Sequence, residues 1–110
     1  MLVVGGIVAG SLVAHTLAAF PRGVDIDRGF SEPALAGREC RTIVSARDET
    51  VVEATEIVPD GPSPRLRETF RLAPGAHRLE VRVAGCRANV RAFDPGTTRR
   101  VTVEYHCAGR

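Results

Sequence analysis

The residues of this chain with the clearest capacity for chemistry are its cysteines, Cys40, Cys86 and Cys107. This number of cysteines allows one disulfide and one remaining thiol. Cys107 directly follows His106, which suggests a thiol–imidazole pair of the kind found in nucleophilic enzymes. Successive side chains of a β-strand point to opposite faces, so these two cannot touch within one strand. The sequence therefore favours a cross-link, with a small redox protein built on the remaining thiol as an alternative.

Other patterns that carry catalysis or bind metals do not occur in the sequence. It contains no CxxC, no zinc-ligand spacing, no G-x-S-x-G and no glycine-rich phosphate loop. The acidic residues are scattered, and His77 starts a candidate strand, where a structural role is expected. We therefore expect a protein that is not an enzyme, with no catalytic residue, no metal site and no cofactor.

Basic character comes entirely from arginine, since none of the fifteen basic residues is lysine. The formal net charge is only +2, so the whole chain is not a strong attractor of polyanions. The arginines expected on the outer face of the last strands form either an ordinary solvated face or an anion-contact face for lipid headgroups or acidic polysaccharide. These arginines are Arg78, Arg82, Arg87, Arg91 and Arg100. Nucleic acid is not expected as a partner, because aromatic residues for base stacking are too few.

The first residues, "MLVVGGIVAGSLVAHTLAAF", contain no charged side chain before Arg22. About 20 apolar residues cross a bilayer core as a helix, and a signal peptide uses a shorter apolar region. We expect residues 1–21 to form a hydrophobic helix that serves as a membrane anchor or a signal segment. A buried helix of a soluble protein remains the alternative. Gly6 and Gly10 form a small-xxx-small pair, which would let two such helices approach as a homodimer.

Two features disagree about the side of the membrane on which the remaining chain lies. Arg22 follows the apolar segment and favours a cytoplasmic location. A disulfide would favour an oxidising compartment, and we give that argument more weight. Residues 22–39 are rich in proline, glycine and charge, and we expect them to form a flexible tether. The folded domain is then expected over residues 40–110.

From Cys40 onward, apolar and polar residues alternate with the period of a β-strand. One apolar face and one polar face are typical of an antiparallel sheet, and the apolar face needs a second layer to cover it. The sequence therefore predicts an all-β fold, a small antiparallel β-sandwich that follows one N-terminal hydrophobic helix. The candidate strands are "CRTIVSA", "TVVEATEIV", "LRETFRL", "HRLEVRV", "RANVRAF" and "RVTVEYHC".

Strand register gives a specific prediction for the cysteines. A two-residue turn at Ala84 and Gly85 would pair two strands so that all inward residues face each other. The predicted pairs are Val83 with Cys86, Val81 with Ala88, and Leu79 with Val90. A hairpin at Pro95–Thr98 would then set Cys86 across from Cys107, within disulfide range. Two buried thiols, or a bridge from Cys40 to Cys107, remain alternatives.

The run "ETFRLAPGAHRLEVRVAGCRANVRAFDPGTTRRVTVEY" resembles bacterial PEGA-type repeats over roughly a third of the chain. Transthyretin-like and carboxypeptidase-regulatory sandwiches resemble it nearly as well. Cys86 stands where the family often has an aromatic residue. The resemblance implies an exported or membrane-tethered interaction module of the bacterial envelope, with an unknown protein or envelope partner. The alternative is an anchored domain facing the cytoplasm, whose arginines bind anionic lipid or a protein. The matching residues are Pro74, Gly75, His77, Leu79, Val81, Gly85, Pro95, Gly96, Val101 and Val103.

Overall fold

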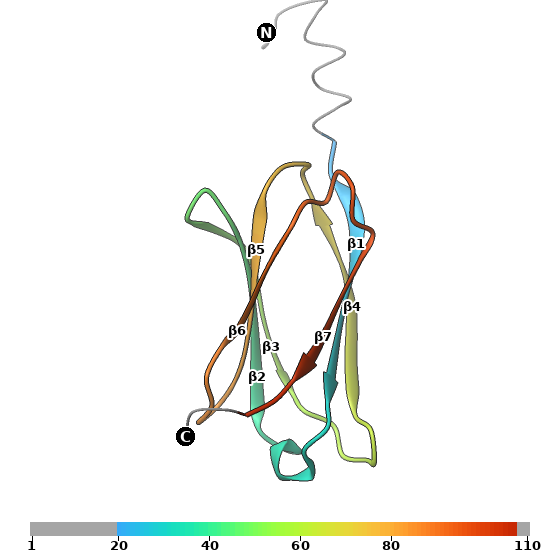
Figure 1. Cartoon of the computed structure of the whole chain (residues 1–110), viewed down its shortest axis with the longest axis vertical. Helices are drawn as coiled ribbons and strands as arrows, with labels where there is room; N and C mark the ends of the chain where they lie inside the picture. Colours follow the sequence, from blue (N-terminus) through green and yellow to red (C-terminus); the bar gives the residue numbers. More distant parts are fainter. Residues whose placement is uncertain (1–19, 108–110) are drawn as a thin grey trace, which may run out of the picture.

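The computed structural model of the chain describes residues 20–107, which form two β-sheets packed as a sandwich (Figure 1). This confirms the predicted all-β, two-layer class. The predicted helix over residues 1–21 and the predicted homodimer contact through Gly6 and Gly10 fall outside the described residues, except for Phe20 and Pro21, which precede the first strand. Within residues 20–107, no helix has the length and apolar character needed to cross a membrane.

One sheet has three strands in the order β4-β1-β7, and the other has four strands in the order β3-β2-β5-β6. A single turn of 3-10 helix, η1 (Pro33–Leu35), lies between the first two strands. The strands are β1 (Arg22–Phe30), β2 (Glu39–Ala46), β3 (Glu49–Ile57), β4 (Arg65–Leu72), β5 (His77–Val83), β6 (Asn89–Phe93) and β7 (Arg100–Tyr105).

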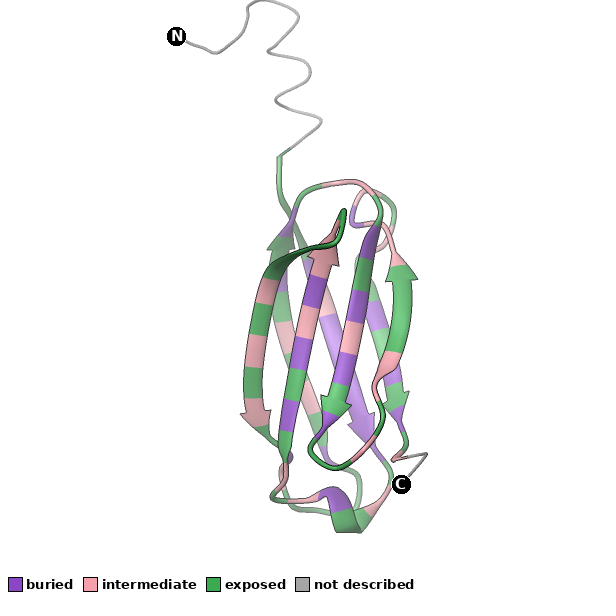
Figure 2. Ribbon diagram, turned by 90° about the vertical axis from the view of Figure 1, so that its left-hand side faces the viewer, coloured by how far each residue is buried: buried purple, intermediate pink, exposed green. Residues whose placement is uncertain are grey.

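Burial alternates along β2, β4, β5 and β7 as the sequence pattern predicts (Figure 2). In β5, Leu79, Val81 and Val83 are fully buried, whereas Arg78 and Arg82 between them are exposed. The inward side chains of both sheets form one hydrophobic core. Burial of this apolar surface is the main favourable contribution to folding, because it removes the side chains from water.

The largest correction concerns residues 22–39, which are not a flexible tether. Residues 22–30 form β1, the central strand of the three-stranded sheet, and η1 follows. Val24, Ile26 and Phe30 are buried in the core on alternate positions of β1. The period of two is present in "VDIDRGF", but charged residues obscure it. Because Arg28 occupies an inward position, the segment does not read as a half-apolar strand.

The predicted hairpin between residues 87–93 and 100–107 is also wrong. β6 and β7 lie in different sheets, and β7 pairs with β1 in a parallel arrangement from Asp25↔Arg100 to Phe30↔Tyr105. The sandwich is therefore mixed rather than purely antiparallel. The physical reason is β1 itself, which offers β7 an edge that the prediction did not include. The segment containing Pro95 and Gly96 crosses between the sheets instead of closing a hairpin.

The register between β5 and β6 differs from the prediction by one residue. Leu79 pairs with Arg91 and Glu80 with Val90, so the side chains of β6 are on the opposite faces from those predicted. Val90 is 48% exposed rather than inward. Cys86 and Arg87 lie outside the strands, in a connection over residues 84–88 that is longer than a two-residue turn. A one-residue slip moves every side chain to the other face of a strand.

The loops gather at two ends of the sandwich (Figure 1). The end where β1 starts, called here the N-terminal end, contains Pro21, the turn at Arg47 and Asp48, and loops 73–76 and 94–99. Arg47 and Asp48 both have positive φ, as a tight two-residue hairpin turn requires. The opposite end contains loops 31–38, 58–64 and 84–88, together with His106 and Cys107.

Candidate functional site

A disulfide joins Cys86 to Cys107 at the opposite end, with their Cα atoms 5.1 Å apart. The predicted partners are confirmed, and the alternative bridge from Cys40 is not formed. The two cysteines do not face each other across neighbouring strands, however. Cys86 belongs to the loop after β5 and Cys107 follows β7, so the bond connects the two sheets. Glu32 accepts a hydrogen bond from the Cys107 backbone N–H at 2.9 Å.

Tyr105 supports the same end of the molecule from inside the core. Its side chain is fully buried, and its ring lies 6.0 Å from that of Phe30, centroid to centroid. The hydroxyl donates a hydrogen bond to the Arg87 carbonyl and accepts one from the Val83 backbone N–H. Burial raises the pKa of the Tyr105 hydroxyl, so it stays protonated and can donate. Tyr105 thus fixes the loop that carries Cys86.

The predicted arginine face is not one surface. Arg78 and Arg82 project from the outer face of the four-stranded sheet, whereas Arg100 lies on the outer face of the three-stranded sheet. Arg87 is in the loop before β6, and Arg91 shares the inner side of its sheet with Leu79. All five side chains are exposed. The structure therefore divides the set among different faces, although Arg78 and Arg100 both lie toward the N-terminal end of the sandwich.

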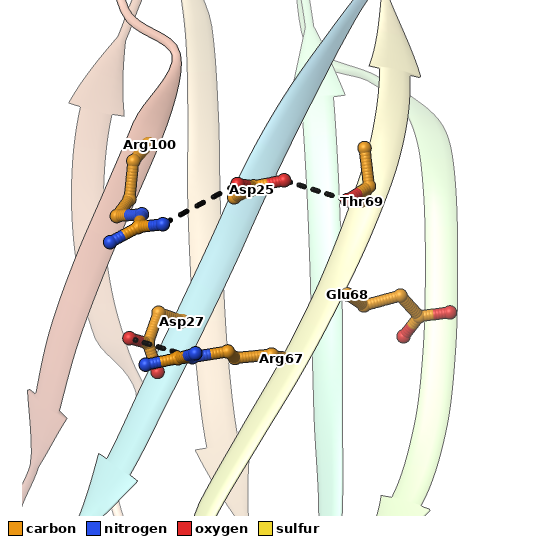
Figure 3. Close-up of a pocket in the computed structure, with 6 residues that line it drawn as sticks. All are labelled: Asp25, Asp27, Arg67, Glu68, Thr69 and Arg100. Atoms are coloured by element: carbon orange, nitrogen blue, oxygen red, sulfur yellow. Dashed lines mark hydrogen bonds and ion pairs between the residues drawn. The ribbon is translucent and has the colours of Figure 1, made fainter.

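The three-stranded sheet has a charged groove of about 270 Å³ on its outer face (Figure 3). Asp25 and Asp27 come from β1, with cationic side chains from β4 and β7 on either side. Asp25 accepts a hydrogen bond from the Thr69 hydroxyl at 2.6 Å and lies 3.7 Å from the Arg100 guanidinium. Figure 3 shows Glu68, which also borders the groove, turned away from these aspartates.

Asp27 is the most enclosed charge in this groove. Its side chain is only 7% exposed, and it contacts Arg65 at 3.0 Å and Arg67 at 3.4 Å. Burial alone would raise the pKa of the Asp27 carboxyl, but the hydrogen bonds and charges of Arg65 and Arg67 together lower it. Arg65 also bonds Glu104 at 2.9 Å, and this pair lies over Gly29, where a Cβ atom would collide with both side chains.

This arrangement determines what the groove can do chemically. A carboxyl with a lowered pKa stays ionised near neutral pH and is a poor proton donor, so Asp27 does not suit general acid catalysis. Both aspartates already have cationic or hydroxyl partners. Arg67 and Arg100 keep 66% and 59% of their side chains exposed. The groove therefore presents guanidinium groups that are held in place and remain accessible to anions.

A second charged cluster lies inside the sandwich, between β3 and β4. Arg28 is the largest fully buried side chain of residues 20–107, and its Nη1 donates to Thr42 Oγ1 and to Glu56 Oε1, each at 2.7 Å. Glu68 lies 3.9 Å from Nη2, beyond hydrogen-bond distance. Within residues 20–107, the Nε and Nη2 atoms of Arg28 are buried with no hydrogen-bond partner. Such a cluster closes the gap between two edge strands with one ion pair.

Cys40 is the free cysteine of the described chain, and it is fully buried on the inner face of β2. Burial raises the pKa of its thiol, and the nearby charge of Arg28 offsets this only in part. A reactive cysteine needs an exposed thiolate of lowered pKa, and Cys40 has neither property. Its chemistry is that of a small apolar core residue.

The histidines of residues 20–107 have structural surroundings. His77 contacts the Gly75 carbonyl at 2.8 Å through Nδ1 and packs 5.7 Å from Phe93. His106 lies 3.2 Å from the Ser31 hydroxyl. No group of histidine, cysteine and acidic side chains in this part of the chain converges to hold a metal ion.

Sequence reasoning missed Arg28 and the aspartates of the groove. The signal that could have found them is the alternation of Val24, Asp25, Ile26 and Asp27, which assigns the aspartates to the outer face of a strand. No family model matches this chain, and neither the curated proteins nor the solved structures contain a significant match.

Proposed function

We propose that this protein is a non-catalytic interaction or structural module of the bacterial envelope, exported or held at the membrane by residues 1–21. The observation that carries the proposal is the disulfide between Cys86 and Cys107. Disulfides persist in oxidising compartments and are rare in the cytosol. The uncharged apolar sequence before Arg22 supplies a route out of the cytoplasm.

The charged groups of the described chain also support a binding or structural role. Asp25 and Asp27 are engaged by neighbouring side chains, and Cys40 is a buried thiol. Exposed guanidinium groups offer contacts to anions instead of a reaction centre. The likeness of residues 68–105 to PEGA-type repeats points the same way, since those sandwiches serve as interaction modules. Membership of that family remains a prediction.

Counting free thiols in the full-length protein tests the proposed compartment. The chain is expressed in a bacterium, and the cells are quenched in acid and denatured with a mass-adding maleimide. A domain outside the cytoplasm should gain the mass of one maleimide, on Cys40, and the mass of three maleimides after reduction of the disulfide. The matched control is the same chain without residues 1–21, kept in the cytoplasm, which should gain three maleimides before reduction. Three maleimides on the unreduced full-length chain would contradict the proposal.

A second function remains open because Arg22 follows the apolar segment and favours a cytoplasmic domain. In that arrangement the anchored domain would bind anionic lipid or a protein partner inside the cell. The two functions are separated by a host strain without its periplasmic thiol oxidase. Loss of that oxidase should raise the count of free thiols in an exported domain and leave that of a cytoplasmic domain unchanged.

A further inference from the structure

The N-terminal end of the sandwich is rich in exposed arginines that come from separate parts of the sequence. Strand starts, strand ends and loops all contribute to it, because β1, β3, β5 and β7 start there while β2, β4 and β6 end there (Figure 1). These exposed residues, called here the arginine end, are Arg22, Arg47, Arg71, Arg78, Arg99 and Arg100.

Most of these arginines have no acidic partner among residues 20–107. Arg22 donates to the Gly96 carbonyl and Arg71 to the Pro21 carbonyl, each at a long 3.3 Å. Within the described part of the chain, only Arg100 of this set pairs with a carboxylate, that of Asp25 at 3.7 Å. The guanidinium groups therefore remain available for a partner of opposite charge.

Acidic residues at this end cancel only part of the positive charge. The Asp94 carboxylate accepts hydrogen bonds from the backbone N–H groups of Gly75 and Gly96 at 2.9 and 2.7 Å. These bonds lower the pKa of Asp94, so it stays ionised and occupied. Asp48 and Glu49 are confined to the hairpin between β2 and β3.

Among residues 20–107, the opposite end shows no comparable excess of arginine. Arg38 there donates to the Ala84 carbonyl and contacts the sulfur of Cys86, and Arg87 is exposed. Arg65 and Arg82 also lie toward this end, but Arg65 pairs with Asp27 and Glu104, and Arg82 pairs with Glu80. Glu32, Glu39 and Asp60 accompany them. The two ends of the sandwich therefore differ in charge, and the arginine end is the one that continues into the apolar sequence before Phe20.

We propose that the arginine end is a contact surface for anionic phospholipid headgroups. This rests on the proposed membrane attachment through residues 1–21, which would bring this end, and no other, to the bilayer. Guanidinium groups bind phosphate with two parallel hydrogen bonds, and arginine close to an anionic surface is attracted over roughly one Debye length. Charge complementarity and the position of the apolar segment thus select the same occupant.

The test uses the full-length chain in bilayers of phosphatidylcholine, with and without phosphatidylglycerol. A fluorophore is attached at Ala73→Cys in the exposed loop between β4 and β5, and a nitroxide on the lipid headgroup quenches it. Cys40 is buried and the other cysteines are bonded, so the new thiol is the one labelled among the described residues. A label at Ser63→Cys, at the opposite end, serves as the distant reference.

Phosphatidylglycerol should increase quenching at Ala73→Cys, leave Ser63→Cys unchanged, and lose its effect in high salt. The triple variant R71Q/R78Q/R99Q should lose most of the increase. The matched triple variant R82Q/R87Q/R91Q removes the same charge from other exposed positions and should keep it. Thermal melts of both variants verify that the fold is retained.

Equal quenching with and without phosphatidylglycerol, or equal losses in the two triple variants, would overturn the lipid-contact proposal. Failure of the full-length chain to float with phosphatidylcholine vesicles would instead overturn the proposed attachment. In that case, phosphatidylglycerol vesicles would still support the lipid contact if they bind the wild-type chain and R82Q/R87Q/R91Q but not R71Q/R78Q/R99Q. Failure of these vesicles to bind the wild-type chain would reject the lipid contact.

Discussion

The two long sides of the sandwich are closed in different ways. On the side of β6 and β7, a disulfide and the buried Tyr105 hydroxyl connect the sheets. On the side of β3 and β4, the charged side chain of Arg28 extends between the sheets and bonds Glu56 on β3. One side relies on a covalent bond between loops, and the other relies on a buried ion pair.

The difference matters because the two devices stabilise the fold by different physics. A disulfide acts largely by reducing the conformational entropy of the unfolded chain. A buried ion pair contributes little net stability, since desolvation offsets the attraction, but breaking it leaves an unpaired charge in the core. We therefore expect the β6–β7 side to respond to reduction and the β3–β4 side to respond to loss of one charge.

Removal of the disulfide should have the largest effect. The double variant C86A/C107A should lose about 3 kcal/mol of unfolding free energy, because the cysteines are 21 residues apart. For a domain of this size, that corresponds to a fall of roughly 10–20 °C in Tm. Urea unfolding measures the change. Reductant should destabilise the wild-type protein and leave the double variant unaffected. Equal stability of the two proteins without reductant would refute the expectation.

Loss of the charge at Glu56 should rank second. Glu56→Gln should lower the free energy of unfolding by about 2 kcal/mol, because Arg28 would remain charged and fully buried. The carboxylate of Glu68, 3.9 Å from Arg28 Nη2, would then be its remaining acidic neighbour among residues 20–107. The cost stays below that of a wholly buried pair, since 30% of the Glu56 side chain is exposed.

The matched control for this change is Glu53→Gln on the same strand. Glu53 pairs with Arg41 on the surface, so its loss should cost less than about 0.5 kcal/mol by the same urea titration. The double variant Arg28→Met, Glu56→Gln should recover part of the stability lost in Glu56→Gln alone. If Glu56→Gln costs no more stability than Glu53→Gln, the ion pair on the β3–β4 side is dispensable.

The contrast between the two sides also explains how much of the fold the sequence could predict. Alternation in residues 77–83 correctly placed the inward residues Leu79, Val81 and Val83, because each position obeys the rule of apolar inside and polar outside. β1 was missed because Arg28 breaks that rule. Its burial depends on Thr42 and Glu56, which are distant in sequence, so no local pattern reveals it.

Tyr105 should give the third effect. Tyr105→Phe keeps the ring and removes the hydroxyl, which leaves the Val83 N–H and the Arg87 carbonyl without their shared partner. Loss of these buried hydrogen bonds should cost about 1–2 kcal/mol in urea unfolding. The cost should change in the C86A/C107A background, because Tyr105 and the disulfide hold the same loop. If the stability losses of Tyr105→Phe and C86A/C107A simply add, the Tyr105 hydroxyl and the disulfide act independently.

The candidate charged surfaces were harder to predict than the cysteine pair. Cys86 and Cys107 were paired correctly from a wrong register, since both the predicted hairpin and the observed loops bring them to one end of the domain. The arginine end could not be found by the same means. Its members come from strand termini and loops of both sheets, which are brought to one end only by the pairing of β1 with β4 and β7 and by the packing of this sheet on the other.

Asp27 should give the smallest effect, and one that depends on pH. Its pKa is lowered in the folded state, so its contribution to stability is present above the unfolded value of about 4 and is lost as pH falls through the folded value. The contribution is expected to be about 1 kcal/mol or less, because Arg65 and Arg67 are 36% and 66% exposed and solvent screens them.

Urea unfolding of the wild-type protein and Asp27→Asn, from neutral pH down to strongly acidic pH, measures this contribution. The wild-type protein should be more stable near neutrality, and the two curves should converge as Asp27 is protonated. Arg65→Gln should reduce the same pH dependence, since it removes the hydrogen bond and charge that lower the pKa of Asp27. Parallel curves for wild type and Asp27→Asn would mean that the groove, unlike the β3–β4 side, contributes no charge-dependent stability.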